Sequence, residues 1–344
     1  MADDITQDRR QTLEAMNMCL DYQPAIIRIL GIGNAGGKAL QHMINSGLGG
    51  AGQEIISFIY ADTDAQALAG SGVEHKILLG EELLHGCGTE SRPELGTRAA
   101  KESVDAIRKA IGDADIVFVI SGMGGGTGTG AVPVIAKAAK EKGVLTMVVV
   151  TTPFHFEGDK RMKSAMKGID ELRQHVDNPL IVSNDRLLAI APKNANLTEM
   201  LKKAEEVLYA AVRGVTDLVT KPGIINADFD DVRTVMSKQG MALMGEGVAS
   251  GENRAIDAAK KAISSPLLED ITIGGAKAIL VNITASEDMG MDEFCNAGSF
   301  IRDAAKGPDG EEPEIIIAMS VDENSGDEMR ITVIATGIEP HSRE

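Results

Sequence analysis

The segment from Gly122 to Gly130 constrains the fold of this chain more than any other part of the sequence. It has six glycines in nine positions, follows the apolar run 115–120 and precedes a helical pattern that starts at Ala131. Glycine leaves the backbone N–H groups of such a strand-to-helix turn uncovered, and these groups point toward whatever lies at the helix N-terminus. The sequence therefore predicts a cradle for a polyphosphate, in which Thr127 and Thr129 add hydroxyl donors. A flexible linker is disfavoured because two regular elements hold the segment at both ends.

Short apolar runs alternate with helix-period segments along the first half of the chain. This alternation is typical of a Rossmann-like α/β domain, in which helices cover both faces of a parallel sheet. Ligands of such sheets bind at the carboxyl ends of the strands. The predicted strands are 25–30, 55–60, 115–120, 144–150 and 180–182, and the predicted helices include 131–142 and 161–176.

A second glycine loop, from Gly31 to Lys38, follows the first predicted strand and has the spacing G-x-G-x-x-G. This spacing is the fingerprint of dinucleotide-binding folds, in which Asp62 at the end of the second strand would bind a ribose. An isolated match of this kind fits a tight turn that binds nothing equally well. A dinucleotide-dependent oxidoreductase therefore stays open as an alternative function, although it gives residues 122–130 no role.

From Asn196 the pattern changes to one long helix, which ends at Pro222-Gly223. At 1.5 Å per residue this helix is roughly 39 Å long and would connect two domains. A smaller α/β domain is predicted after it, with strands at 278–284, 314–318 and 330–335 and helices near 254–264 and 292–305. The expected division is an N-terminal extension 1–23, a nucleotide-binding domain 24–195, the connecting helix 196–222, a C-terminal domain 223–338 and a short tail 339–344.

The formal net charge is −17, from 34 basic and 51 acidic residues in a chain of 344. This charge disfavours binding to nucleic acid and to anionic membranes. No apolar run approaches the 18 or so residues that cross a bilayer, and the first residues have no signal-peptide core, so we expect a cytoplasmic protein without direct membrane insertion. Three cysteines at unrelated spacings indicate neither a metal site nor a disulfide framework.

Several long motifs, in order along residues 25–338, resemble those of the tubulin/FtsZ family. The resemblance implies a GTPase that binds GTP or GDP, together with Mg²⁺, and assembles head to tail into protofilaments. It also implies GTP hydrolysis at the contact between subunits, and a role in bacterial cell division at the division site, with division or membrane-adaptor proteins as further partners. Domain 24–195 then binds GTP, and domain 223–338 is the activation domain. Besides residues 122–130, the matching stretches are 61–68, 152–158, 226–236, 245–251 and 263–270.

The resemblance assigns the phosphates to the two glycine loops and the base to the long helix. Glu157 and Arg161 match ribose and phosphate contacts, whereas Asn184, Leu201 and Glu205 match guanine contacts. A carboxylate at 205 can accept hydrogen bonds from N1–H and the 2-amino group of guanine, whereas adenine presents an acceptor at N1. The implied phosphate-binding residues are Gly33, Asn34, Ala35, Gly36, Gly37, Lys38, Gly124, Gly125, Gly126, Thr127, Gly128, Thr129 and Gly130.

Asn226, Asp228 and Asp231 match a loop that, in the family, completes the active site of the next subunit. Two carboxylates three residues apart at the start of a helix share a face and could orient water and a cation. The resemblance therefore implies that these three residues are catalytic. An N-terminal helix cap by Asp228 is compatible with the same spacing.

Two departures from the family pattern affect these expectations. Thr89, Glu90, Ser91 and Arg92 replace a small, glycine-rich stretch in a loop that lies near the γ-phosphate in relatives. Glu90 and Arg92 would then act on that phosphate in opposite directions, unless both only face water. The long linker and adaptor-binding peptide of relatives have no match after residue 338. Either this tail was removed, or the chain is a specialised paralogue that forms a non-division filament or regulates assembly, and the paralogue stays as a second hypothesis.

Overall fold

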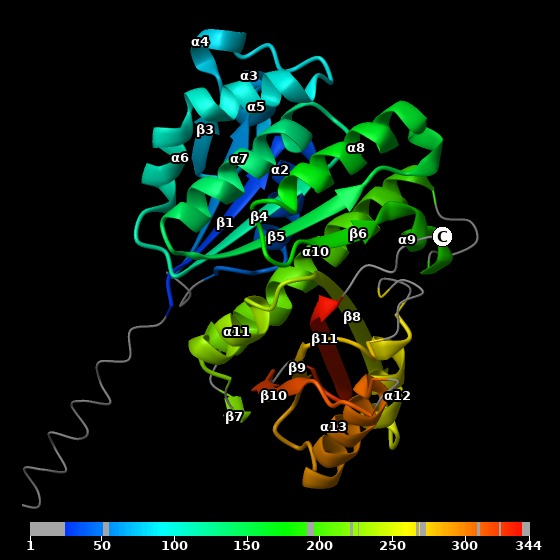
Figure 1. The fold of residues 1–344 in the computed structure, drawn as a ribbon. Coiled ribbons are helices and arrows are strands. Elements are labelled where there is room, and N and C mark those ends of the chain that lie inside the picture. The colour runs from blue at the N-terminus through cyan, green and yellow to red at the C-terminus, as the bar shows by residue number, and fades with distance from the viewer. Residues whose placement is uncertain are drawn as a thin grey trace, which may run out of the picture.

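A computed structural model describes most of the chain, and Figure 1 shows two sheet-containing parts with a long helix between them. The predicted N-terminal extension and tail lie outside the described residues, and so does Asn226. The described residues are 25–50, 55–190, 196–220, 223–225, 227–265, 268, 273–307, 310–322 and 325–338.

The strands of the described residues form one sheet in the order β3-β2-β1-β4-β5-β6-β8-β11-β9-β10-β7. The first six strands pair in parallel, which confirms the predicted α/β class. β6 and β8 meet at only one pair, Leu180 and Ala242, so the sheet is narrowest between its two halves. β3 was not predicted. The strands of the first half are β1 (Ile27–Ile32), β2 (Ile56–Asp62), β3 (His75–Leu78), β4 (Ile116–Gly122), β5 (Leu145–Thr152) and β6 (Leu180–Ser183).

Helices cover both faces of this parallel half, as the sequence predicts. Residues of α2, α3, α9 and the long helix share one buried apolar cluster with one face of the sheet. Residues of α5, α6, α7 and α8 share a second cluster with the other face. The bounds are α2 (Gly33–Asn45), α3 (Ala65–Gly70), α4 (Glu81–Leu84), α5 (Pro93–Glu102), α6 (Val104–Ile111), α7 (Thr127–Glu141), η1 (His155–Glu157), α8 (Asp159–Leu172) and α9 (Asn184–Ile190).

The long helix α10 (Leu197–Thr220) has 24 residues and a length of about 36 Å. Asn196 and Glu199 form reciprocal hydrogen bonds at its start, each from a backbone N–H to the other's side chain at 3.0 Å. Its buried face packs against α2 and also reaches strands of the C-terminal half. α10 therefore connects the two halves of the molecule.

The C-terminal half contains the predicted strands and helices together with two strands that were not predicted, the short β7 and the long β8. A Cβ at Gly245 or Gly247 in β8 would overlap a backbone carbonyl of α12, so glycine lets the helix pack closely on this strand. The elements are β7 (Gly223–Ile225), α11 (Phe229–Met236), β8 (Met241–Ser250), α12 (Arg254–Ile263), β9 (Ala278–Ala285), α13 (Met291–Ala305), β10 (Glu314–Val321) and β11 (Glu328–Ile338).

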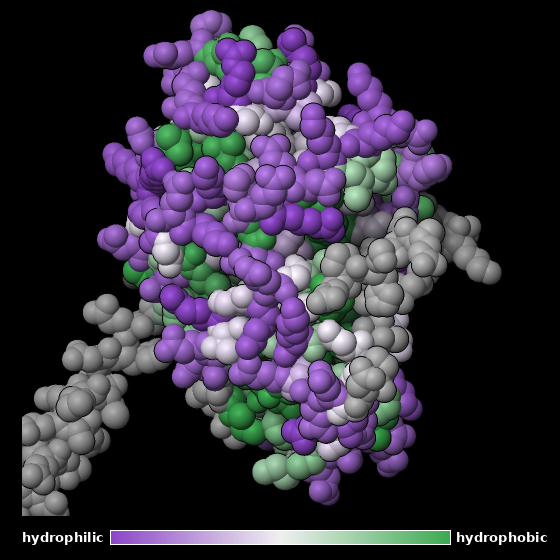
Figure 2. All heavy atoms as spheres, viewed as in Figure 1, coloured by the Kyte–Doolittle hydropathy of each residue, from purple (hydrophilic) through white to green (hydrophobic). Residues whose placement is uncertain are grey.

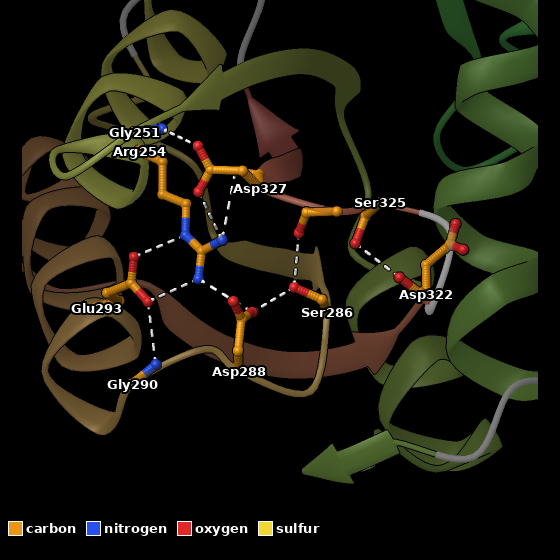
Figure 3. A network of polar contacts seen from close by, with 10 residues as sticks. Gly251, Arg254, Ser286, Asp288, Gly290, Glu293, Asp322, Ser325 and Asp327 are labelled. Carbon is orange, nitrogen blue, oxygen red and sulfur yellow. Dashed lines mark hydrogen bonds and ion pairs between the residues drawn. The ribbon is translucent and has the colours of Figure 1, made fainter.

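A buried arginine links several segments at one end of the C-terminal half (Figure 3). Arg254, at the start of α12, is 5% exposed and donates to both carboxylate oxygens of Glu293, at 2.8 and 3.0 Å. Asp288 and Asp327 each accept a longer hydrogen bond of 3.4 Å from the same guanidinium. These partners lie on three different segments, so one side chain links α12 to α13 and to the turn before β11.

On the face drawn in Figure 2, hydrophilic side chains cover most of the surface of both halves. Among the described residues, no helix combines the length and the apolar character that a membrane span needs.

Candidate functional site

A cavity of about 610 Å³ opens at the carboxyl edge of the parallel strands, where the strand order predicts a ligand. The turns that follow β1, β2, β4, β5 and β6 all contribute to its lining, and so do the loop 87–91 and one face of α10. Asn184 follows β6 and Thr63 follows β2, four strand positions away in the sheet. At the usual strand spacing this separation is about 19 Å, so the cavity runs along the sheet edge.

Two helices begin at the floor of this cavity. α2 begins at Gly33, directly after β1, and α7 begins at Thr127. The sequence predicted the start of α7 at Ala131, four residues later, because so many glycines indicate a loop. The glycine-rich segment instead supplies the first turn of the helix. The predicted phosphate residues that line the cavity are Gly33, Asn34, Ala35, Lys38, Gly125, Gly126, Thr127 and Gly128.

The other predicted phosphate residues lie behind this lining and have packing roles. A Cβ at Gly36 would lie 2.6 Å from the carbonyl oxygen of Ile120, and one at Gly37 would lie 2.5 Å from the ring of Tyr60. A Cβ at Gly130 would overlap the backbone of α5. These three glycines let helices approach a strand or another helix closely.

Gly124 and Thr129 hold the shape of the glycine-rich turn. The Gly124 N–H donates to Thr129 Oγ1 at 2.8 Å, and Thr129 is 2% exposed. The Thr129 hydroxyl was predicted to bind a ligand, but it accepts a hydrogen bond within the protein. Its place in the first turn of α7 turns it inward, whereas Thr127 lines the cavity.

The predicted ribose and base contacts all line the cavity, on the side of β5, β6 and α10. They are Glu157, Arg161, Asn184, Leu201 and Glu205. Glu157 and Arg161 form an ion pair, and Glu157 also accepts a hydrogen bond from the backbone at the start of its turn.

Asn184 is 7% exposed, and its Oδ1 has no hydrogen-bond partner within the described part of the chain. A buried polar atom without a partner destabilises the folded protein unless a ligand or water forms a hydrogen bond with it. Together with the carboxylate of Glu205, it makes this end of the cavity rich in hydrogen-bond acceptors.

Asp62, the candidate ribose ligand of the oxidoreductase alternative, has a different role. Asp62 belongs to the cavity lining but is only 3% exposed, and its carboxylate accepts hydrogen bonds from the Tyr60 hydroxyl and the Thr63 N–H, both at 2.7 Å. Burial raises the pKa of Asp62 above its ordinary value of 3.8, and burial likewise raises the pKa of Tyr60. Because protein donors engage both carboxylate oxygens, Asp62 shapes the turn after β2.

The variant loop 89–92 lies at the β2 end of the cavity. Thr89, Glu90 and Ser91 belong to the lining, whereas Arg92 does not. Arg92 instead forms an ion pair with Glu90 at 2.9 Å, and both side chains are more than half exposed. The two charges therefore neutralise each other at the rim.

Asp228 and Asp231 lie far from the cavity, beyond the other end of α10. Glu205 is 15 residues before the last residue of this helix, a distance of about 22 Å along its axis. The Asp231 N–H donates to Asp228 Oδ1 at 2.7 Å, and the Asp228 N–H donates to Asp231 Oδ2 at 3.0 Å. The pair thus forms a reciprocal cap on α11, which one of the two sequence interpretations described.

Several cavity residues were not among the predicted ligands. Thr63 and Asp64 directly follow β2, and their position at a carboxyl strand end is a signal that could have identified them. Cys87 and Met123 carried no comparable signal, because the former lies in a loop after unpredicted elements and the latter within the glycine-rich segment. No cluster of three or more metal-ligating His, Cys, Asp or Glu side chains is present in the part of the chain that the structure describes.

Comparisons with known proteins match both halves of the chain to one family. Residues 26–192 match the GTPase domain model of the tubulin/FtsZ family, and residues 240–339 match the C-terminal domain model of the FtsZ family. The cell division protein FtsZ of Buchnera aphidicola subsp. Baizongia pistaciae is 48% identical over 91% of this chain and 79% of its own length. That of Coxiella burnetii is 47% identical over 93% of this chain and 81% of its own.

Solved structures of similar fold include an empty FtsZ dimer from M. jannaschii, with a TM-score of 0.85 and 38% identity over 96% of this chain and 92% of that one. CetZ1 from Haloferax volcanii in its GDP-bound form shares the fold, with a TM-score of 0.78 and 19% identity over 91% of this chain and 94% of its own.

Proposed function

The chain belongs to the tubulin/FtsZ family of GTPases, and on this premise we propose that it assembles head to tail and hydrolyses GTP where two subunits meet. The cavity binds GTP or GDP, with the base between Asn184 and Glu205 and the phosphates over the starts of α2 and α7. Residues 24–195 act as the GTP-binding domain and residues 223–338 as the activation domain.

The position of Asp228 and Asp231 is the observation that carries the shared-site proposal. Both carboxylates lie beyond the end of α10 that is remote from the cavity, so they cannot reach a nucleotide bound in the same subunit. A second copy stacked end to end would bring them to that nucleotide. Such a contact uses two different surfaces of one chain, so it continues into a filament unless the rotation between subunits closes a ring. Asn226 belongs to the same proposed catalytic loop.

The base end of the cavity supports a preference for guanine. Glu205 offers a carboxylate and Asn184 an unpaired buried acceptor, and guanine presents N–H donors at N1 and at its 2-amino group. Adenine would place its N1 acceptor against these oxygens, and an unpaired buried group of this kind costs several orders of magnitude in selectivity. Leu201 supplies an aliphatic contact to the base.

The phosphate end supports a bound Mg²⁺. Thr63, Asp64 and Thr127 bring side-chain oxygens to this part of the lining, and oxygen ligands are those that Mg²⁺ prefers. Since the described residues hold no cluster of three or more His, Cys, Asp or Glu side chains, the cation would be bound chiefly through phosphate oxygens and water. When bound, it would neutralise charge on the phosphates, while the protein positions the nucleotide.

The biological role we propose is bacterial cell division, in the cytoplasm at the division site. The support is that relatives at 48% and 47% identity are cell division proteins and that a similar solved structure is a dimer. A regulator of assembly that binds GTP without hydrolysis is a second candidate, because Thr89–Arg92 replaces the glycine-rich stretch of relatives.

Phosphate release from GTP and from ATP, measured over a range of protein concentrations, tests the proposal. We expect release per subunit to rise above a threshold concentration with GTP and to stay at background with ATP. A full rate at high dilution would contradict the shared site, and equal rates with ATP would contradict the guanine assignment. Binding of GTP without hydrolysis at any concentration would favour the regulator.

A further inference from the structure

The cavity lining by itself attracts a polyanion poorly. Of the lining residues that the structure describes, only Lys38 and Arg161 are basic, and Arg161 is already paired with Glu157. Five acidic side chains line the same cavity, and the whole chain has a formal net charge of −17. The N–H groups at helix starts attract phosphates only at short range. A nucleotide that approaches from solvent therefore meets repulsion from most of the molecule.

Three lysines follow the mouth of this cavity along the outer face of α8, a helix that covers the parallel half on one side (Figure 1). Lys160, Lys163 and Lys167 are all exposed, and their spacing places them on one face of the helix. None of them forms an ion pair with another residue that the structure describes. We call these three residues the lysine row of α8.

The charges of α8 are arranged against helix stability. Acidic residues stabilise the first turn of a helix and basic residues the last turn. The first turn of α8 contains Lys160 and Arg161 beside Asp159. Its last turn contains Asp170 and Glu171 and no basic residue. The helix dipole therefore does not explain the lysine row, and a role outside the helix is favoured.

The lysine row is close enough to the cavity mouth to act through solvent. Lys160 is adjacent in sequence to the lining residue Arg161, and Lys167 is six residues after it, about 9 Å along the helix axis. The Debye length at physiological ionic strength is about 8 Å. The positive potential of the row therefore reaches the mouth, most strongly from Lys160 and Lys163, and added salt must weaken it.

We infer that the lysine row of α8 steers the nucleotide to the cavity. It raises the rate at which GTP or GDP associates and does not contact the nucleotide once it is bound. The inference rests on the proposed nucleotide-binding function and deepens it, because it assigns capture of the ligand to residues outside the lining. The lining determines how long the nucleotide stays bound, and the lysine row determines how often it arrives.

The test measures the association and dissociation rates of a fluorescent GDP with the full chain by stopped flow. In Lys160→Gln/Lys163→Gln/Lys167→Gln we expect the association rate to fall by about fivefold or more at low salt, and the dissociation rate to stay within about twofold. The difference should largely disappear at about 1 M salt, where the Debye length is about 3 Å. Lys160→Arg/Lys163→Arg/Lys167→Arg keeps the charge and should keep the wild-type rates.

Lys101→Gln/Lys109→Gln/Lys260→Gln is the matched control. It removes the same charge from exposed lysines on α5, α6 and α12, outside the cavity lining. Its association rate should stay within about twofold of the wild type, because the potential of these lysines is screened before it reaches the mouth. A guanosine with the same fluorescent label and no phosphate should associate equally fast with the wild type and with the glutamine variant of the lysine row.

A wild-type association rate in the glutamine variant of the lysine row, or an equal fall in the control variant, would overturn the inference. Faster dissociation with unchanged association would overturn it as well, since the lysines would then contact the bound nucleotide. Equal slowing of the labelled guanosine would show that charge attraction is not the cause. If the wild-type chain binds no fluorescent GDP at equilibrium, the proposed function itself fails.

Discussion

Glu205 and Glu206 are neighbours on α10 with different surroundings. Glu205 lines the cavity, whereas Glu206 forms an exposed ion pair with Lys203 at 2.7 Å. We therefore predict that Glu205→Gln lowers the selectivity for GDP over ADP by about ten- to a hundredfold, because the amide presents a donor to one of the guanine N–H groups. Competition with a fluorescent guanine nucleotide measures this ratio.

Glu206→Gln controls for the change of charge on the same helix. It should leave the selectivity unchanged, and the melting temperature of both variants should stay close to that of the wild type, since partly exposed helix positions tolerate this substitution. Equal effects of the two substitutions on selectivity would contradict the placement of the base against Glu205.

At this scale the sequence predicted which segments meet at the site but not which atom of each segment faces the ligand. Thr127 and Thr129 are equivalent in the sequence pattern, yet only Thr127 lines the cavity. The difference arises because α7 begins at Thr127, so its first turn rotates one hydroxyl outward and buries the other. Which hydroxyl faces outward depends on the residue at which the helix begins, and this residue cannot be predicted from a glycine-rich sequence.

At the scale of elements, the ion pair of Arg254 and Glu293 makes the stability of the C-terminal half depend on pH (Figure 3). The hydrogen bonds from Arg254 hold the pKa of Glu293 below its ordinary value of 4.5. The pair therefore contributes fully above that pH, and its contribution is lost as the pH falls through the lower folded value.

We predict that Arg254→Met lowers the free energy of unfolding by about 3 kcal/mol at neutral pH, since the substitution leaves a carboxylate without its buried partner. The difference from the wild type should shrink below pH 4.5, where Glu293 becomes protonated in the unfolded chain. Denaturant unfolding at a series of pH values measures it. Lys306→Met, which breaks an exposed ion pair with Asp303, is the control and should change stability little. A difference that does not vary with pH would contradict the role of Glu293.

β8, which the sequence failed to predict, has a pattern that depends on a neighbouring helix. β8 contains Gly245 and Gly247, which indicate a turn when read alone, but both lie where α12 packs against the strand. Apart from β3, a partly exposed edge strand, the strands of the parallel half were predicted because burial on both faces gives each of them a continuous apolar run. Close packing of a helix on a strand instead requires glycine in that strand, and a sequence pattern rich in glycine indicates a loop.

At the scale of the whole molecule, α10 separates the nucleotide cavity from Asp228 and Asp231, and these residues have two candidate roles. The substitution Asp228→Asn distinguishes the two roles. Asparagine caps a helix as well as aspartate does, but it has no carboxylate. If the carboxylate acts on the nucleotide of the next subunit, the variant should bind GTP normally and lose at least about tenfold in turnover.

Asp230→Asn is the matched control, since Asp230 lies between the two residues and takes no part in the reciprocal cap. Phosphate release at a concentration that supports assembly, together with nucleotide affinity, measures both variants. Normal turnover in Asp228→Asn would reduce Asp228 to a helix cap.

A site divided between subunits also predicts that two inactive variants restore each other. Ala35→Glu places a carboxylate in the phosphate cradle, at an exposed residue of the lining, and should abolish nucleotide binding. Asp228→Asn keeps the cavity but lacks the carboxylate. In a mixture, an Ala35→Glu subunit can present its intact Asp228 to the GTP held by an Asp228→Asn subunit, and this requires only one contact between them.

We expect each variant alone to release phosphate at background and the mixture to recover a measurable fraction of the wild-type rate, rising with the concentration of either partner. Failure of the mixture, with both variants folded and Asp228→Asn still binding GTP, would show that cavity and carboxylate do not act across a subunit contact.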